Sequence, residues 1–169
     1  QGCGTRIDYY EQWAVRIGQR LPADIAVWNL GLGYARAANA ATNGAWLAKA
    51  RHCDEINICL GVNDLLGDQR SADEVLADLA QIIRILKDNG VKSVILLTVP
   101  PFNFTAEHEQ RWRRINQVIR INPPAGVDRV FDIAAVLSRP APEENISRFD
   151  PHPDGEGGAA VADAYMAWY

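Results

Sequence analysis

Residues 71–99 hold the feature that most constrains the fold, an amphipathic helix followed directly by a strand that is apolar on both faces. The helix segment spaces its apolar side chains three and four residues apart, begins at a Ser-x-x-Glu capping box and ends at Asn89 and Gly90. The strand segment, 91–99 (VKSVILLTV), lacks the alternation of a strand with one solvated face. Such a strand is typical of the centre of a parallel sheet that helices cover on both sides.

The same alternation of strands and helices extends along the chain. Further strands are predicted at residues 24–30 (DIAVWNL), 55–60 (EINICL) and 127–133 (VDRVFDI), and further helices at 8–20, 34–51, 105–121 and from Asp154 onward. This order predicts βαβ units and therefore an α/β fold, a parallel sheet with helices on both faces. The 169 residues show no repeat or linker and suffice for one core, so we expect a single domain over residues 1–169.

Composition and charge exclude several classes of protein. The sequence is 48% hydrophobic and 22% charged, which is ordinary for a globular protein. A net charge of −4 without a basic stripe argues against a nucleic-acid partner. The cluster 111–114 (RWRR) is interpreted as the solvated face of a helix. No apolar run approaches the ~20 residues that a membrane-spanning helix needs, so no such helix is expected.

The cysteine pattern indicates neither a disulfide framework nor a metal site. The three cysteines, Cys3, Cys53 and Cys59, are odd in number, which favours a reducing compartment. His52 and Asp54 flank Cys53, but no second cluster with suitable ligand spacing accompanies them. We therefore expect no metal.

The segment 150–157 (DPHPDGEG) carries the strongest candidate for chemistry. Asp150 stands two residues before His152, so a carboxylate is close enough to orient a histidine that acts as general base. Pro153 stiffens this loop, which favours a catalytic role over that of an ordinary surface histidine. His108 lies on a polar predicted helix without evident partners, and we expect it to be inert.

Two loops that follow predicted strands are candidates for an oxyanion-binding site, because functional groups of open parallel sheets gather at the carboxyl ends of strands. After the first strand, the Gly31–Gly33 pair begins like a dinucleotide fingerprint, but Arg36 stands where its third glycine belongs. Two interpretations remain, a turn that needs positive φ and a backbone N–H at a helix N-terminus that binds an oxyanion. In 61–64 (GVND), Asn63 is either part of an Asx turn or a neutral donor to developing negative charge, and Asp64 supports the loop.

A nucleophile for acyl transfer is not identified from the residues themselves. No physical argument places Cys3, Thr5, Thr42 or Thr98 against His152.

Three tryptophans are candidates for a sugar-binding surface. Trp28 and Trp46 are expected to pack in the core, and Trp112 is left open.

Several blocks in order along the chain resemble those of the SGNH/GDSL hydrolase family. They are 29–33 (NLGLG), 61–64 (GVND), 99–101 (VPP), Asn116 with Ile119 and Arg120, and 152–157 (HPDGEG). The resemblance implies a flavodoxin-like three-layer α/β/α sandwich with a parallel sheet. It also implies ester hydrolysis through an acyl-enzyme, without a metal or an organic cofactor.

The resemblance gives roles to four residues. His152 would be the base and Asp150 its orienting acid, while the N–H near Gly33 and the amide of Asn63 would form the oxyanion hole. The implied partner is a small-molecule ester, with a small acyl or acetyl group on a carbohydrate or lipid. The alternatives are a non-catalytic domain that binds a carbohydrate or acylated ligand and a regulatory flavodoxin-like domain. Oligomeric state is left open.

The chain departs from the family pattern in three places. Family members begin with a strand and Gly-Asp-Ser, so the nucleophilic serine and the first strand are expected upstream of Gln1. The family places its Asp three residues before the His, where this chain has Phe149. The oxyanion glycine usually stands five residues after the Asn of its block, where this chain has Tyr34, and we assign the role to Gly33.

Overall fold

The computed structural model describes residues 11–67, 70–153 and 155–169. The chain divides into two compact units, which are described separately. The helical unit comprises Gln1–Gly33, Pro100–Asn103 and Ile133–Tyr169. The sheet unit comprises Tyr34–Val99 and Phe104–Asp132.

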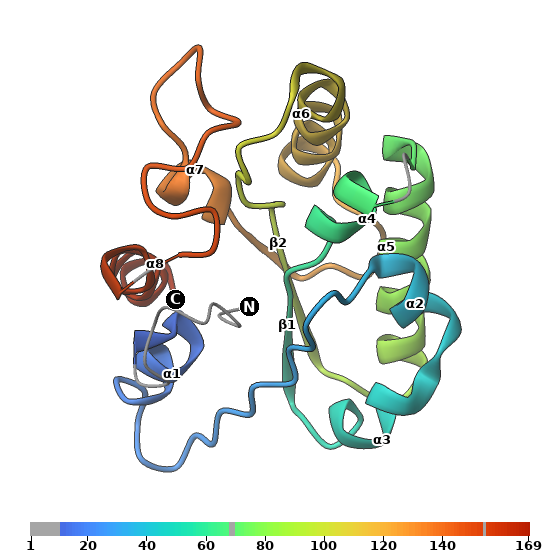
Figure 1. Cartoon of the computed structure of the whole chain (residues 1–169). Coiled ribbons are helices and arrows are strands. Elements are labelled where there is room, and N and C mark those ends of the chain that lie inside the picture. The colour runs from blue at the N-terminus through green and yellow to red at the C-terminus, as the bar shows by residue number, and fades with distance from the viewer. Residues whose placement is uncertain (1–10, 68–69, 154) are drawn as a thin grey trace. The chain divides into compact units, whose positions relative to one another are not determined.

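Three parallel strands form the centre of the sheet unit, in the order β1-β2-β3. They are β1 (Glu55–Ile58), β2 (Ser93–Leu97) and β3 (Arg129–Phe131). Figure 1 labels the first two of them. Ile58 of β1 is paired with Leu96, and Leu97 with Phe131 of β3. The predicted strands over 55–60, 91–99 and 127–133 are confirmed in position, although each is shorter than predicted.

The helix that precedes β2 is the predicted one. α5 (Ala72–Asp88) begins at Ser71, whose Oγ accepts a hydrogen bond from the Glu74 N–H at 3.2 Å, while the Glu74 carboxylate accepts one from the Ser71 N–H at 2.8 Å. This reciprocal pair satisfies two donors that a helix N-terminus leaves open. Gly90 ends the segment with φ of 86°, as expected for a left-handed C-cap.

α5 contacts two other helices of the sheet unit, α2 (Ala37–Thr42) and α6 (Ala106–Ile121) (Figure 1). Its buried face consists of Ala72, Val75, Leu79, Ile82, Ile83 and Leu86. α6 confirms the helix predicted over 105–121. A short α4 (Val62–Gly67) follows β1, where the sequence predicted a loop.

The helical unit is built on its terminal helix. α8 (Gly155–Trp168) contacts both α1 (Trp13–Gly18) and α7 (Ile133–Leu137). A Cβ on Gly158 would lie 2.3 Å from the backbone oxygen of Glu11, so only glycine permits this close approach. The predicted caps at Asp8 and Asp154 lie outside the described residues. α7 was not predicted, because its first residue was read as the end of the preceding strand.

Two predicted elements are wrong. Residues 24–30 form no strand, and Ile25, Val27 and Trp28 are 41%, 42% and 56% exposed. An apolar extended segment becomes a strand only where another strand offers hydrogen bonds, and no ladder in the described residues includes this one. The helix predicted over 34–51 is broken into α2, η2 (Gly44–Trp46) and α3 (Leu47–Ala50). Asn43 causes the break, because its side chain accepts a hydrogen bond from the Ala45 N–H and starts a new turn.

The tryptophans also differ from expectation. Trp112, left open as a surface residue within the arginine cluster, is 2% exposed, whereas Trp28, expected in the core, is exposed. Trp46 is half-buried and donates from Nε1 to the Ala40 carbonyl. Arg113, by contrast, is exposed as predicted. Among the described residues, no helix combines the length and apolar character needed to cross a membrane.

Candidate active site

The turn from β1 into α4 requires a glycine. Gly61 has φ of 124°, and a Cβ there would lie 2.7 Å from Cγ2 of Val99. Both the backbone conformation and the close packing exclude larger residues. The turn therefore begins a helix at once and places Asn63 in its first turn, so the Asx turn considered for Asn63 is wrong.

One N–H of the Asn63 amide is already committed. Nδ2 donates to the Ala35 carbonyl at 3.0 Å, which holds the half-buried side chain in one orientation. A carboxamide nitrogen carries two hydrogens. Among the described residues Ala35 is the one acceptor of this amide, so the second hydrogen remains for another group.

Asp64 holds the N-terminus of α2, whereas the sequence predicted that it supports its own loop, 61–64. Its fully buried carboxylate accepts hydrogen bonds from the Ala37 and Ala38 N–H groups at 2.9 and 3.4 Å. These are the first amides of α2, where a negative charge is favourable. Arg70 Nη1 lies 3.5 Å from the same carboxylate and also pairs with Asp78. The opposite charge of Arg70 reduces the cost of burying Asp64.

Gly33 does not occupy the helix N-terminus that the oxyanion hypothesis assumed. Asp64 fills that N-terminus, and Gly33 lies in an exposed turn before it, with open space where a Cβ would stand. The alternative of a glycine with positive φ also fails at this position, because Tyr34 has the left-handed conformation, with φ of 59°. Tyr34 is 91% exposed.

A buried amide holds the residue at which the chain leaves β2. Asn116 Oδ1 accepts from the Val99 N–H at 2.7 Å, and Asn116 Nδ2 donates to the Val99 carbonyl at 2.9 Å. Trp112 Nε1 donates to the same carbonyl at 2.7 Å. Since Val99 also packs against Gly61, this clamp restrains the turn that carries Asn63.

Two of the hydroxyls considered as nucleophiles donate hydrogen bonds to other groups. Thr98 Oγ1 donates to Asp132 at 2.8 Å and is fully buried, while Thr42 Oγ1 donates to the Ala38 carbonyl at 2.9 Å. Cys3 and Thr5 lie outside the described residues.

The described thiols are poorly suited to nucleophilic attack. Burial raises the pKa of the Cys59 thiol to about 11, and burial followed by the charge of Asp54 raises that of Cys53. Because the thiolate is the reactive form, both thiols are weak nucleophiles at neutral pH. Within the described ranges, no cluster of three or more His, Cys, Asp and Glu side chains suits a metal.

In the helical unit, His152 is exposed on the loop between α7 and α8. Its ring lies 5.0 Å from the Phe102 ring at an interplanar angle of 80°, an edge-to-face contact. Asp150 is half-buried two residues earlier. Among the described residues, no hydrogen bond joins its carboxylate to the His152 ring.

Ser147 organises this loop, a role that the sequence reasoning missed. The buried Ser147 donates its N–H to Asn103 Oδ1 at 3.1 Å and its Oγ to the Asp150 carbonyl at 3.3 Å. The same Oγ accepts from the Phe149 N–H at 3.1 Å. The available signal was weak, a serine between Ile146 and Arg148, a few residues before the Asp150–His152 pair.

His108 has partners, contrary to expectation. Its Nδ1 lies 2.8 Å from Thr105 Oγ1, and its ring lies 6.4 Å from that of Phe104. Thr105 is the residue predicted to cap α6, but its hydroxyl is bonded to His108 and makes no cap hydrogen bond.

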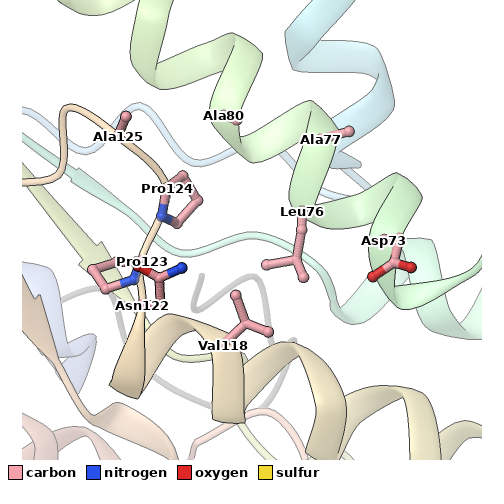
Figure 2. Close-up of a pocket in the computed structure, with 9 residues that line it drawn as sticks. All are labelled: Asp73, Leu76, Ala77, Ala80, Val118, Asn122, Pro123, Pro124 and Ala125. Carbon is pink, nitrogen blue, oxygen red and sulfur yellow. The ribbon is translucent and has the colours of Figure 1, made fainter.

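An open groove of about 590 Å³ lies elsewhere in the sheet unit, between α5, α6 and the following loop (Figure 2). Its lining residues are Asp73, Leu76, Ala77, Ala80, Val118, Asn122, Pro123, Pro124 and Ala125. Asp73 is its one ionisable side chain, and none of the four predicted site residues lines it. Because active sites combine apolar walls with several convergent polar groups, we do not assign the chemistry to this groove.

Solved structures with the same fold cover nearly the whole chain. A member of the lipolytic protein G-D-S-L family from Veillonella parvula DSM 2008 has a TM-score of 0.73 at 16% identity, over 99% of this chain and 92% of that one. A G-D-S-L family protein from Desulfitobacterium hafniense DCB-2 has a TM-score of 0.73 at 18% identity, over 99% and 93%. A carbohydrate esterase family 3 protein from Talaromyces cellulolyticus has a TM-score of 0.65 at 15% identity, over 97% and 90%. These likenesses confirm the predicted α/β fold, a parallel sheet with flanking helices.

None of the curated proteins compared with the chain matches it. The model of the GDSL-like lipase/acylhydrolase family matches residues 1–160. This match supports an ester-hydrolase activity without defining a substrate. Because it covers almost all of the 169 residues, the chain belongs to the GDSL-like lipase/acylhydrolase family.

Proposed function

We propose that the protein is a serine esterase that hydrolyses a carboxylic ester through an acyl-enzyme. The observation that carries this proposal is the Asn63 amide, which one hydrogen bond orients while its second N–H is left for an acceptor. A pre-oriented neutral donor suits the negative oxygen of a tetrahedral intermediate, because it needs no reorganisation during the reaction.

The reaction is written with His152 as the base. A serine oxygen attacks the ester carbonyl carbon as His152 takes the serine proton, which gives a tetrahedral oxyanion. The Asn63 amide stabilises that oxygen, and Asp150 orients the imidazole. Gly33 is kept as the second donor on its backbone N–H alone, without the contribution of a helix N-terminus. The carbon–alkoxy bond then breaks, and the proton on His152 passes to the leaving alcohol. Water hydrolyses the acyl-enzyme by the same route and returns the serine.

We place the nucleophile on a serine upstream of Gln1, as the Gly-Asp-Ser block of the family suggests. Residues 24–30 support this placement, since Ile25, Val27 and Trp28 expose apolar side chains and the segment has no ladder partner in the described part of the chain. A strand bearing the serine would supply such a partner. N-terminal sequencing with intact-mass measurement of the native protein tests this, and finding no serine upstream of Gln1 refutes it.

The substrate class is an ester with a small acyl or acetyl group, on a carbohydrate or lipid. The likeness to the Talaromyces cellulolyticus carbohydrate esterase makes acetylated sugars the first class to assay. The test compares wild type with His152→Ala on a panel of acetyl and short-chain esters, alongside fluorophosphonate labelling. His108→Ala is a matched control, because it removes a histidine from α6 in the other unit. Loss of hydrolysis in His152→Ala alone supports the proposal, and equal rates in both variants contradict it.

A second candidate is a non-catalytic domain that binds a carbohydrate or acylated ligand. The observation that favours it is that, among the described residues, the His152 ring donates no hydrogen bond to the Asp150 carboxylate. This candidate requires that an acylated sugar binds the native protein and is recovered intact. It also requires that fluorophosphonate does not label the protein.

A further inference from the structure

We propose that Phe102 and Asn103 are positioning residues for His152, an inference that rests on the proposed function. The two residues are neighbours in Pro100–Asn103, a segment of the helical unit. Each makes a separate contact with the loop that bears His152. Together they restrain both the start of that loop and the ring at its end.

The first contact acts on the imidazole itself. The centroids of the Phe102 and His152 rings are 5.0 Å apart and the rings are nearly perpendicular, at 80°. This separation lies within the preferred range for edge-to-face aromatic pairs. His152 is otherwise exposed, so a ring packed against it limits the rotamers that an exposed side chain would sample.

The second contact acts on the backbone of the loop. Asn103 Oδ1 accepts the Ser147 N–H at 3.1 Å, and the Ser147 hydroxyl is bonded to the Asp150 carbonyl and to the Phe149 N–H. Backbone bonds tie the residues on either side of Ser147, since the Arg139 N–H donates to the Ile146 carbonyl at 2.9 Å and the Arg148 N–H to the Leu137 carbonyl at 2.7 Å. Asn103 therefore restrains the backbone at Ser147, five residues before His152.

The conformation of Asn103 explains why this residue type stands there. Its φ is 52°, in the left-handed region that side chains other than those of asparagine and aspartate rarely adopt. Glycine adopts this conformation readily but offers no acceptor for the Ser147 N–H. The position thus needs both tolerance of positive φ and a side-chain oxygen, and such strained residues cluster at functional sites.

Two substitutions at Asn103 separate the acceptor from the backbone conformation. Asn103→Gly keeps the conformation and removes the acceptor, whereas Asn103→Asp keeps both. We expect Asn103→Gly to lower kcat by about 10- to 100-fold, the scale of small misplacements of catalytic groups, with a smaller change in KM. Asn103→Asp should restore most of the rate. Phe102→Leu should lower kcat in the same direction without touching the Ser147 bond.

Ser138→Ala is the matched control. Ser138 Oγ donates to the Glu144 carbonyl at 2.6 Å, so this variant removes a hydroxyl bond from the same loop without touching Asn103 or Ser147 Oγ. A merely structural role for Asn103 predicts that Ser138→Ala lowers kcat as much as Asn103→Gly does. That result would overturn the proposal.

NMR of the His152 ring protons gives a readout that does not depend on activity. In the native chain Phe102 should displace these signals by its ring current, and Phe102→Leu should abolish the displacement. Asn103→Gly should also reduce it, although Phe102 is still present, and Asn103→Asp should not. Unchanged His152 signals in Asn103→Gly would refute the positioning role. If neither wild type nor any variant hydrolyses an ester, the proposed function fails while the NMR comparison still decides whether Phe102 and Asn103 position the ring.

Discussion

The turn that carries Asn63 and the loop that carries His152 are held in different ways. In the sheet unit, Asn63 lies in a helix and is half-buried. Two residues before it, Gly61 packs against Val99, which the Asn116 side chain holds. In the helical unit, His152 is exposed. Its loop is held by the Ser147 hydroxyl, and its ring makes an edge-to-face contact with Phe102. The proposed chemistry accounts for the difference. An oxyanion donor acts best when it does not move, whereas a base must receive a proton from one oxygen and deliver it to another.

The comparison is tested most strongly at Asn63 itself. Asn63→Ala should lower kcat on the order of 10²–10³-fold, the usual effect of removing one oxyanion donor. The exposed Asn39 on α2 provides a control, and Asn39→Ala should leave kcat unchanged. Steady-state kinetics on an ester that wild type hydrolyses is the measurement. A loss of less than threefold would remove Asn63 from the proposed role.

The clamp on Val99 should be next in size. Asn116→Leu leaves the buried Val99 N–H without its acceptor and the Val99 carbonyl with one donor fewer, at roughly 1–3 kcal/mol for each group affected. Urea denaturation should therefore show a loss of about 3 kcal/mol in the free energy of unfolding. Gln117→Leu, an exposed change on the same helix, should cost far less. Equal midpoints for the two variants would mean that the clamp does not stabilise the sheet unit.

One glycine from each unit, Gly61 and Gly33, allows the effect of an added methyl group to be compared between the two units. Gly61→Ala forces a Cβ into Val99 at positive φ and should cost about 1–3 kcal/mol of stability. Gly33→Ala adds a methyl group to open space and keeps the backbone N–H, so both stability and kcat should be retained. Thermal denaturation and the esterase assay check both expectations. A large loss of kcat in Gly33→Ala would show that this turn is more constrained than its open surroundings suggest.

The smallest effect concerns charge on the sheet unit. The hydrogen bond from Lys87 lowers the pKa of Asp128, and the bond from the Val94 N–H acts in the same direction. A carboxyl whose pKa is lower in the folded state stabilises the fold above its unfolded pKa, near 3.9, and this stability is lost as pH falls through the folded value. Asp128 is 44% exposed, so solvent should limit the effect to under about 1 kcal/mol.

Asp128→Asn should reduce the dependence of stability on pH below about pH 4. Urea denaturation at pH 3 and pH 6 measures this dependence in wild type and variant. Identical slopes in the two proteins would contradict the assignment of Asp128.

The sequence predicted the elements whose signals are local. α5 and β2 follow from a capping box, a helical apolar stripe and a run of apolar residues, all within one segment. The strand predicted at residues 24–30 is wrong because an apolar pattern favours an extended chain but does not specify a neighbouring strand to pair with it. The block 61–64 misled because glycine, asparagine and aspartate are turn formers, whereas here the positive φ of Gly61 starts a helix.

The candidate site could be predicted only in part for the same reason. A turn after a strand points to Asn63, and a Pro-rich loop before the last helix points to His152. Asp64 supports α2 instead of the loop expected for it. The groups that hold them were not accessible to sequence reasoning. Asn116 is 17 residues from Val99, and Asn103 is 44 residues from Ser147, so nothing in the local pattern links either pair.

The clamp on Val99 has a consequence for how the family's architecture can vary. The Asn116 carboxamide offers an acceptor to the N–H and a donor to the carbonyl of one residue, Val99, as a neighbouring strand would at that position. The chain can then turn away at Pro100, which has no N–H to satisfy. Because the described ladder of β2 ends before Pro100, a substitution after that residue removes no hydrogen bond between β2 and its neighbouring strands.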